Sequence, residues 1–362
     1  METSHLSVTV ERDDHKLFSN TQSSQSAQDF RLKRYVGNPV LSPSLNNWEN
    51  FSVCNPGVWC EDGKFLMLYR AAGDDASHRI HLGLAESNDG LHFTRVSDLP
   101  VVSPQDGNSD GGCVEDPRIV KFGDYYYVTY AYRPLPPGRY WENPESLAFM
   151  PDGPMDAPLA FRKNLTHTGL LMSKDLRTFQ RLGRITHPMD DNRDVILFPD
   201  KIGGKYALLH RSKTLIGEKF GCAHPSIWIS FSDDLLSWDN GRLLLKGEFP
   251  WTEKVGGATP PILTNEGWVM LYHGVKNGVY RVGAALLDTE DPAKILSLIP
   301  YPILEPEEEY ELNGLYGDCV FPTGNVVQDG QLYVYYGAAD TYCCLATCEM
   351  AELLVCLKQY RK

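Results

Sequence analysis

The sequence predicts an all-β protein: a five-bladed β-propeller with an N-terminal arm and a short C-terminal helix. Two repeated strand patterns and the near absence of helical periodicity predict this fold. The first pattern is a glycine turn before an aromatic-rich strand, as in DGKFLMLYR from Asp62, and it occurs five times. The second is S-x-D-x-x-x-F/W, which occurs three times. Five units of about 60 residues, each with several strands, fit the blades of a propeller.

The glycine turns define the five units. Asp-Gly or Gly-Gly before β-branched and aromatic residues is typical of a β-hairpin. The spacings are 60, 81, 63 and 63 residues between the aligned glycines, which are Gly63, Gly123, Gly204, Gly267 and Gly330. The longest spacing predicts an insertion in the second unit, residues 133–163, which is rich in Pro, Gly and aromatic residues. We expect it to form a long loop over one mouth of the central cavity.

The second pattern follows the first three aromatic strands and predicts a structural turn. Its Ser and Asp cap the turn, while the aromatic side chain packs between sheets. The three copies are Ser87, Asp89 and Phe93; Ser173, Asp175 and Phe179; and Ser232, Asp234 and Trp238.

Segments at both ends of the chain flank the repeats. Residues 1–36 form the predicted arm, which packs either on the propeller or on a neighbouring subunit. The sequence therefore leaves open whether the protein forms a homo-oligomer. Residues 37–347 form the predicted propeller. Residues 348–362 form a helix and tail, because helical periodicity runs from Cys348 to Lys358.

The composition excludes several classes of protein. The formal net charge of −13 repels nucleic acid and anionic membranes, so an anionic ligand needs a local basic pocket. No apolar run is long enough to span a membrane, and Met1 to Gln28 lacks the apolar core of a secretory signal. Nine cysteines without a C-x-x-C pair indicate free thiols and a cytoplasmic protein. Without a nucleotide motif or metal-ligand cluster, no cofactor is expected beyond a co-substrate.

Polar residues interrupt the segments expected to form the innermost strands. Asp116, Asp194 and Asp318 each stand at the start of such a segment, and Asn55 has a similar place in the first unit. An Asp is unfavourable in a strand and costly when buried without a partner. Any one of them could cap a turn. Together they predict a polar pocket on the propeller axis, which suits the hydroxyl groups of a sugar.

Basic residues follow the aromatic strands at comparable positions. They are Arg70, Arg133, Arg211 with Lys213, and His273. A single exposed Lys or Arg is normally just solvated. Their repeated placement after the same kind of strand directs them to one mouth of the pocket, where they predict an anion site.

The sequence contains the segments NPGVWCEDGKFLMLYRAAG, GCVEDPRIVKFGDYYYVTYAYRPLPPGRYW and GDCVFPTGNVVQDGQLYVYYGAAD. In combination they resemble glycoside hydrolase family 130, the mannoside phosphorylases and related mannosidases, from roughly Gly37 to Asp340. The loop RPLPPGRYW is similar to the branch that acts on β-1,4-mannosyl-N-acetylglucosamine and manno-oligosaccharides. The resemblance implies inverting conversion of a β-mannoside and inorganic phosphate into α-mannose 1-phosphate and a freed sugar.

The resemblance also implies roles for single residues. Asp116, in E-D-P-R, matches the general acid. Four residues match positions near the mannosyl ring, namely Asn55, Arg70, Asp194 and Asp318. Four basic residues match or adjoin positions associated with phosphate, namely Arg133, Arg211, Lys213 and His273. Because phosphate is already a nucleophile, a cationic clamp replaces the general base that an inverting hydrolase needs.

Two other functions stay open from the sequence. An inverting β-mannosidase would keep Asp116 and place a base where phosphate sits, with Glu218 or Glu253 as the candidate. A non-catalytic glycan-binding propeller is the second alternative. The acceptor sugar and linkage are not fixed. In the insertion, Tyr140 and Trp141 either stack on an acceptor ring or pack against the protein.

Overall fold

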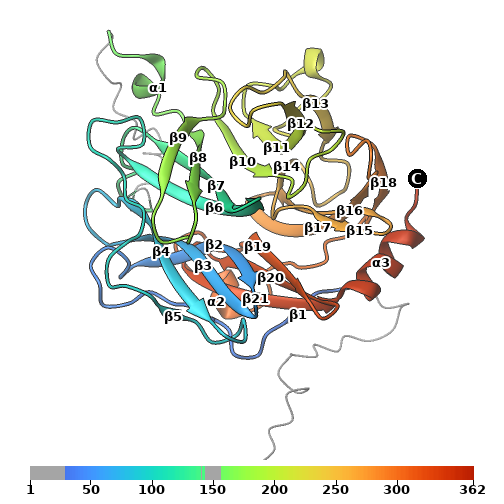
Figure 1. Ribbon diagram of the computed structural model, residues 1–362, viewed down its shortest axis with the longest axis horizontal. Coiled ribbons are helices and arrows are strands. Elements are labelled where there is room, and N and C mark those ends of the chain that lie inside the picture. Colours follow the sequence, from blue (N-terminus) through green and yellow to red (C-terminus); the bar gives the residue numbers. More distant parts are fainter. Residues whose placement is uncertain (1–28, 140, 143–155) are drawn as a thin grey trace, which may run out of the picture.

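The computed structural model describes residues 29–139, 141–142 and 156–362. This part of the chain consists mostly of strands and loops (Figure 1). Three short α-helices accompany the strands, namely α1 (Leu159–Arg162), α2 (Glu309–Leu312) and α3 (Met350–Gln359). The prediction of an all-β protein is confirmed, and α3 is the helix expected near the C-terminus.

The strands follow one another as antiparallel meanders. The first contains β2 (Ser52–Glu61), β3 (Lys64–Ala72), β4 (Ile80–Ser87) and β5 (Thr94–Arg95). The second contains β6 (Cys113–Phe122), β7 (Tyr125–Arg133), β8 (His167–Ser173) and β9 (Gln180–Arg184). A parallel bridge from Ile80 to Cys113 joins both into one eight-stranded sheet.

The remaining three meanders form separate sheets within the described residues. The third contains β10 (Asn192–Leu197), β11 (Tyr206–Ser212), β12 (Ile227–Ser232) and β13 (Arg242–Leu245). In the fourth, β14 (Lys254–Gly257) and β15 (Ile262–Thr264) pair with β16 (Gly267–Lys276), followed by β17 (Val279–Leu287) and β18 (Ile295–Leu298). The fifth contains β19 (Val320–Gln328), β20 (Gln331–Ala338), β21 (Tyr342–Glu349) and the N-terminal strand β1 (Lys33–Arg34).

Strand β1 ties the start of the described chain to its last sheet. Lys33 pairs with Thr347 and Arg34 with Ala346, both antiparallel. The Arg34 guanidinium also forms an ion pair with Glu311, the buried residue of α2. Part of the segment expected as an arm therefore completes the fifth sheet.

The predicted glycine turns join the first and second long strands of the meanders. All five glycines have positive φ, from 58° at Gly123 to 133° at Gly267. Glycine adopts this region at little cost because it has no Cβ. The hairpin prediction from these glycines is confirmed.

The S-x-D-x-x-x-F/W pattern forms the same turn three times. In each copy the Ser hydroxyl donates to the Asp carboxylate, and that carboxylate accepts backbone N–H groups two and three residues later. Phe93, Phe179 and Trp238 each pack against a hydrophobic core cluster. The structural interpretation of this pattern is confirmed.

Strand β16 shows how neighbouring sheets pack. Successive side chains of a strand point to opposite faces. Trp268 and Met270 belong to a core cluster with Ile196 of β10, whereas Val269 belongs to a cluster with Val334 of β20. The fourth meander is therefore buried on both faces, between the third and the fifth.

The first strands of successive meanders contact one another near the middle of the molecule. β2 contacts β6 and β19, and β10 contacts β6 and β14 (Figure 1). Within the described residues no helix is long and apolar enough to cross a membrane. All nine cysteines are free, as the sequence predicts.

Candidate active site

Three of the predicted polar residues occupy matching irregularities in the first strands. Asn55 in β2, Asp116 in β6 and Asp194 in β10 have φ angles of 48°, 55° and 52°. The strand ladder shifts register at each of these points. Asn and Asp tolerate the left-handed region better than most residues, and a bulge re-aims the side chain that it carries. The bulges thus explain why polar residues interrupt these strands.

Side chains that carry hydrogen-bond donors surround Asp116. Asn55 Nδ2 donates to Asp116 Oδ1 over 2.7 Å, and Arg70 Nη1 lies 3.5 Å from the same oxygen. Arg118 Nη1 donates to the backbone carbonyl of Asp116 over 2.8 Å. The structure therefore brings together three of the predicted residues, Asn55, Arg70 and Asp116.

Arg70 is shared among three carboxylates. Besides Asp116, its Nη1 lies 3.5 Å from Glu115 Oε2 and 3.7 Å from Asp340 Oδ2. Burial opposes the charged form of Arg70, but Asp340 and Glu115 raise its pKa well above the usual value. Burial likewise opposes the charged form of Glu115, yet Arg70 and Arg133 lower its pKa. This buried group keeps its charges because they are paired.

Asp194 anchors a second group of charges. Its Oδ2 lies 2.5 Å from Arg211 Nε and 3.5 Å from His273 Nε2, while Oδ1 lies 3.8 Å from Arg118 Nη2. Burial would raise the pKa of Asp194, but the guanidinium groups of Arg211 and Arg118 hold it well below its usual range. Arg118 thus contacts both Asp194 and the backbone of Asp116.

His273 is fully buried behind Asp194. Burial lowers the pKa of His273 to about 3, so the ring is neutral at neutral pH. Neither ring nitrogen makes a hydrogen bond to the described part of the chain. His273 could therefore serve an anion only as a neutral N–H donor, and its predicted phosphate role stays a prediction.

Gly256 makes room for the contact between Asp194 and His273. A Cβ at Gly256 would lie 2.4 Å from Asp194 Oδ2 and 2.5 Å from His273 Cε1. We expect Gly256→Ala to lower the free energy of unfolding by about 1–3 kcal/mol, as overpacking does, and to lower activity because Asp194 must move.

Denaturant unfolding and initial rates measure the Gly256→Ala effect. Gly257→Ala is the matched control, because the one close contact of its Cβ would be the terminal methyl group of Ile196 at 2.7 Å. The Asp194 carbonyl oxygen and Leu209 Cβ would lie at an ordinary 3.7 Å. Equal stability and activity in the two variants would contradict this account of Gly256.

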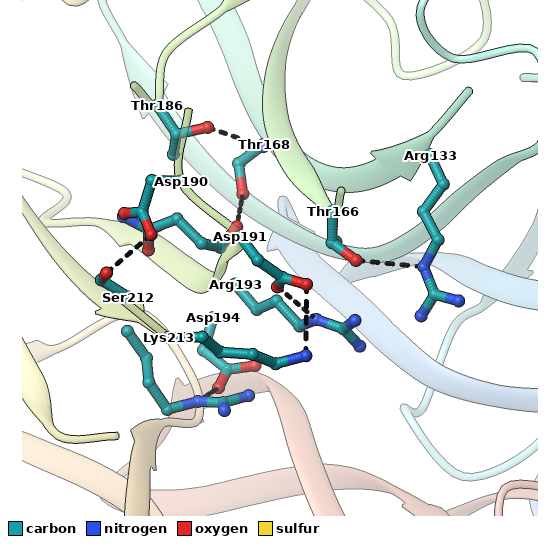
Figure 2. Close-up of polar contacts among 12 residues, drawn as sticks. Arg133, Thr166, Thr168, Thr186, Asp190, Asp191, Arg193, Asp194, Ser212 and Lys213 are labelled. Atoms are coloured by element: carbon teal, nitrogen blue, oxygen red, sulfur yellow. Dashed lines mark hydrogen bonds and ion pairs between the residues drawn. The ribbon is translucent and has the colours of Figure 1, made fainter. Parts of the chain in front are cut away.

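A third group surrounds Asp191. Its carboxylate lies 3.1 Å from Arg193 Nε and 3.2 Å from Lys213 Nζ (Figure 2). Burial lowers the pKa of Lys213 to about 8 and Arg193 adds to this, although Asp191 opposes it. The Lys213 side chain is still 43% exposed, so it can reach a ligand from solvent.

Arg133, the last residue of β7, extends toward the residues around Asp191 (Figure 2). Its Nε donates to Thr166 Oγ1 over 3.0 Å, and its Nη2 lies 3.6 Å from Glu115 Oε1. Figure 2 shows the ends of Arg133, Arg193 and Lys213 extending into the same region. Arg133 and Lys213 were both predicted from the sequence, whereas Arg193 was not.

Lys254 adds another cation from β14. Its Nζ lies 2.9 Å from the hydroxyl oxygen of Tyr280 and 5.0 Å from the centre of that ring. Burial lowers the pKa of Lys254 to about 8, and Arg211 lowers it further. This lysine was not identified from the sequence.

Together these residues form what we call the charged cluster. It has more basic than acidic members: Arg70, Arg118, Arg133, Arg193, Arg211, Lys213 and Lys254 against Glu115, Asp116, Asp191, Asp194 and Asp340. A local excess of positive charge, in a chain of net charge −13, suits an anionic ligand. Within the described residues, no group of His, Cys, Asp or Glu is arranged to hold a metal ion.

Asp318 and Trp141, both predicted as candidate sugar-binding residues, are not part of the charged cluster. Asp318 stands two residues before β19 with φ of 55°, and its side chain is exposed. Its contacts are made by the backbone, whose carbonyl accepts from the Tyr280 N–H over 2.9 Å. Trp141 stacks on Phe51 at 4.7 Å between ring centres, so this ring is at least partly used in packing. Tyr140 lies outside the described residues, and the sugar-binding role of Asp318 stays a prediction.

The sequence profile of glycoside hydrolase family 130, described as beta-1,4-mannooligosaccharide phosphorylase, matches residues 26–136 and 160–359. The chain belongs to glycoside hydrolase family 130. Its relatives include the 1,2-beta-oligomannan phosphorylase of Thermoanaerobacter sp. (strain X514), 38% identical over 89% of this chain and 99% of the relative. The beta-1,2-mannobiose phosphorylase of the same organism is 36% identical over 90% and 99%.

A solved structure of the family has the same fold. The beta-1,2-mannobiose phosphorylase from Listeria innocua, in complex with beta-1,2-mannobiose, aligns with a TM-score of 0.73 and 28% identity. The alignment covers 91% of this chain and 99% of the Listeria chain. The family resemblance drawn from the sequence is confirmed.

Proposed function

We propose that this family 130 enzyme catalyses the inverting phosphorolysis of β-mannosides, releasing α-mannose 1-phosphate and a free sugar. The observation that carries the proposal is the charged cluster, in which Asp116 adjoins a surplus of basic side chains. The relatives support the substrate class, because those aligned over nearly their whole length are named as mannoside phosphorylases. Their names also favour a β-1,2 linkage over the β-1,4 linkage considered from the sequence.

The cluster divides into groups with different chemical roles. Asp116 is the proposed general acid, with Asn55 and Arg70 holding its carboxyl group. Arg133 and Lys213, with Arg193, form the proposed phosphate clamp. A phosphate oxygen attacks C1 of mannose from the face opposite the leaving oxygen. The leaving oxygen takes the proton of Asp116, and the proton carried by hydrogen phosphate restores it.

The remaining predicted residues have supporting parts in this scheme. Arg211 and His273 both contact Asp194, so they hold this carboxylate in place for the sugar, and their direct bonds to phosphate stay predictions from the sequence. We propose that Asp194 and Asp318 bind sugar hydroxyls. The ion pairs of Asp194 with Arg211 and Arg118 orient its carboxylate in advance for such a bond.

The hydrolase alternative has less support from the geometry. A base for water would have to face Asp116 across the sugar. Glu218 is exposed in a short 3₁₀ turn (Glu218–Phe220), and Glu253 pairs with His224 at 3.5 Å, half exposed. Neither belongs to the charged cluster, whose other carboxylates are held in ion pairs with Arg or Lys.

We also propose that the five meanders are the blades of a five-bladed propeller. The contacts between successive first strands and the pairing of β1 with β21 support this arrangement. The charged cluster would then occupy its axis, because Asn55, Asp116 and Asp194 come from the first strands. A cytoplasmic location, and assembly into a homo-oligomer, remain predictions from the sequence.

Purified enzyme incubated with β-1,2-mannobiose or β-1,4-mannobiose, with and without phosphate, tests the function. We expect turnover only with phosphate, and faster with the β-1,2 substrate. Equal turnover in phosphate-free buffer would favour the β-mannosidase. Absence of turnover on both disaccharides would favour a glycan-binding protein.

The two lysines of lowered pKa predict a pH dependence of phosphate use. Because Lys213 and Lys254 have pKa values of about 8, both carry charge below that pH and lose it above. We expect the KM for phosphate to rise about tenfold above this pH, since a bond to a charged group is lost. Initial rates across the pH range measure it.

Lys213→Arg is the matched variant for this test, since Arg keeps its charge throughout the range. We expect a smaller rise of the phosphate KM in the variant, with the KM for mannoside changing little with pH in both proteins. An identical rise in variant and wild type would exclude Lys213 as its cause.

A further inference from the structure

A cavity lies in the third meander, beside the charged cluster. It has a volume of about 660 Å³ and opens between the segment after β9 and the segment after β12. Asn192, His210 and Ser230 line it from three adjacent strands, and Trp238 and Asp239 line it from the turn before β13. Pockets of about 300–1,000 Å³ are typical of small-molecule sites.

The cavity and the phosphate clamp use alternate residues of one segment. Asp190 and Asn192 line the cavity, whereas Asp191 and Arg193 form ion pairs in the charged cluster. Neighbouring residues of an extended chain point to opposite sides. Figure 2 shows Asp190 turned toward Ser212 and Asp191 turned toward Arg193. The cavity is therefore separate from the site proposed for catalysis.

A chain of neutral polar groups lines the inner wall. Asn192 Nδ2 lies 3.0 Å from His210 Nδ1, and His210 Nε2 lies 3.1 Å from Ser230 Oγ. Burial lowers the pKa of His210 to about 4, which keeps the ring neutral at neutral pH. Asn192 is almost fully buried, and its Oδ1 accepts no hydrogen bond within the described part of the chain. This oxygen has almost no accessible surface, so it belongs to the polar wall behind the cavity and does not itself face the cavity.

Glycine keeps this wall open to a ligand. A Cβ at Gly241 would lie 2.8 Å from Ser230 Oγ and 3.0 Å from His210 Nε2. Trp238 is half-buried, and its indole N–H donates to the Leu235 carbonyl over 3.1 Å, which fixes the ring. The cavity therefore combines a fixed aromatic ring with neutral donors and acceptors at its base.

We propose that this cavity is a second binding site for a neutral sugar, a mannose unit of an oligosaccharide. Hydroxyl groups of the sugar would exchange hydrogen bonds with polar groups of the lining, among them His210, Ser230 and Asp239. The choice of mannose rests on the proposed function, whereas the choice of a neutral hydroxylated ligand rests on the cavity. Asp190 and Asp239 outnumber Arg184, the one Lys or Arg side chain among the described residues of the lining, so the cavity does not favour an anion, and carboxylates can accept from sugar hydroxyls.

Calorimetric titration with β-1,2-mannobiose, in the absence of phosphate, tests the proposal on the full chain carrying Asp116→Asn. Leu236→Trp fills the mouth of the cavity, where Leu236 is 47% exposed. Leu263→Trp is the control, since Leu263 is 46% exposed on β15, away from the cavity. Asn192→Leu keeps the number of side-chain heavy atoms but removes the amide that bonds His210 and Asp190, and it provides a second route if one variant folds poorly.

We expect a binding event that Leu236→Trp and Asn192→Leu abolish and that Leu263→Trp keeps. A titration unchanged by both cavity variants, or with no event beyond the active site, would overturn the proposal. Turnover by the corresponding variants with Asp116 intact separates the two functions. The cavity variants could abolish the binding event while the protein with Asp116 intact fails to cleave mannobiose. This combination would refute the proposed function and leave the sugar site standing.

Discussion

Asp116→Asn is expected to lower kcat by about 10²–10⁴-fold, the usual contribution of general acid catalysis. The amide cannot supply the proton that the leaving oxygen needs. The fold should be kept, because Asn still accepts the hydrogen bond from Asn55 and tolerates a φ of 55°. Initial rates at saturating phosphate and mannoside measure the effect, and thermal unfolding checks the fold.

Asp329→Asn is the matched control for the acid variant. Asp329 also has a positive φ, 50°, but it is exposed in the turn between β19 and β20. We expect this control to keep wild-type rates. Near wild-type turnover by Asp116→Asn would remove Asp116 from the catalytic role.

Arg211→Ala is expected to destabilise the protein by about 3–5 kcal/mol, as when one partner of a buried ion pair is removed. The variant leaves Asp194 buried with only the more distant Arg118 and a neutral His273 beside it. Denaturant unfolding measures the loss. Asp194→Asn in the same chain should recover part of the stability, because it removes the unpaired charge.

Arg242→Ala is the control for Arg211→Ala. Arg242 pairs with Asp291 at 3.2 Å, but its side chain is 57% exposed, and such pairs contribute about 0–1 kcal/mol. The same measurements separate two roles of Arg211. A large rise in the phosphate KM with unchanged stability would make Arg211 a phosphate ligand and contradict its part in holding Asp194.

Local patterns in the sequence predicted much of the fold. Each glycine turn and each S-x-D turn depends on residues a few positions apart, so its chemistry is visible in a short window. The pairing of β1 with β21 was not predictable in this way. It joins residues more than 300 positions apart, and two residues carry no clear strand pattern.

The candidate site was predictable where residues repeat at matching strand positions. Asn55, Asp116 and Asp194 each lie in a bulge of their own strand, and their matching positions predicted a polar pocket but not the bulges. Asp318 does not follow this pattern. Strand β19 starts two residues after it, so the Asp318 side chain lies outside the bulge of that strand. Asp340, in the turn before β21, carries no local signal at all. Only its position beside Arg70 assigns it to the charged cluster.

Arg193 shows a different limit of the sequence. It precedes Asp194 directly, and a neighbour in a regular strand would point away from the pocket. The bulge between Arg193 and Ile196 changes that alternation, so both side chains join the charged cluster. The sequence indicated a polar strand start but not the register shift that brings both residues to one side.

The configuration of the first product tests the central claim most directly. Proton NMR of the early reaction mixture, with β-1,2-mannobiose and phosphate, distinguishes the two anomers of mannose 1-phosphate. A single displacement on a β-mannoside must give the α-phosphate. The account therefore predicts α-mannose 1-phosphate as the first product, with free mannose as the released acceptor sugar. Early appearance of β-mannose 1-phosphate, or cleavage at the same rate without phosphate, would contradict it.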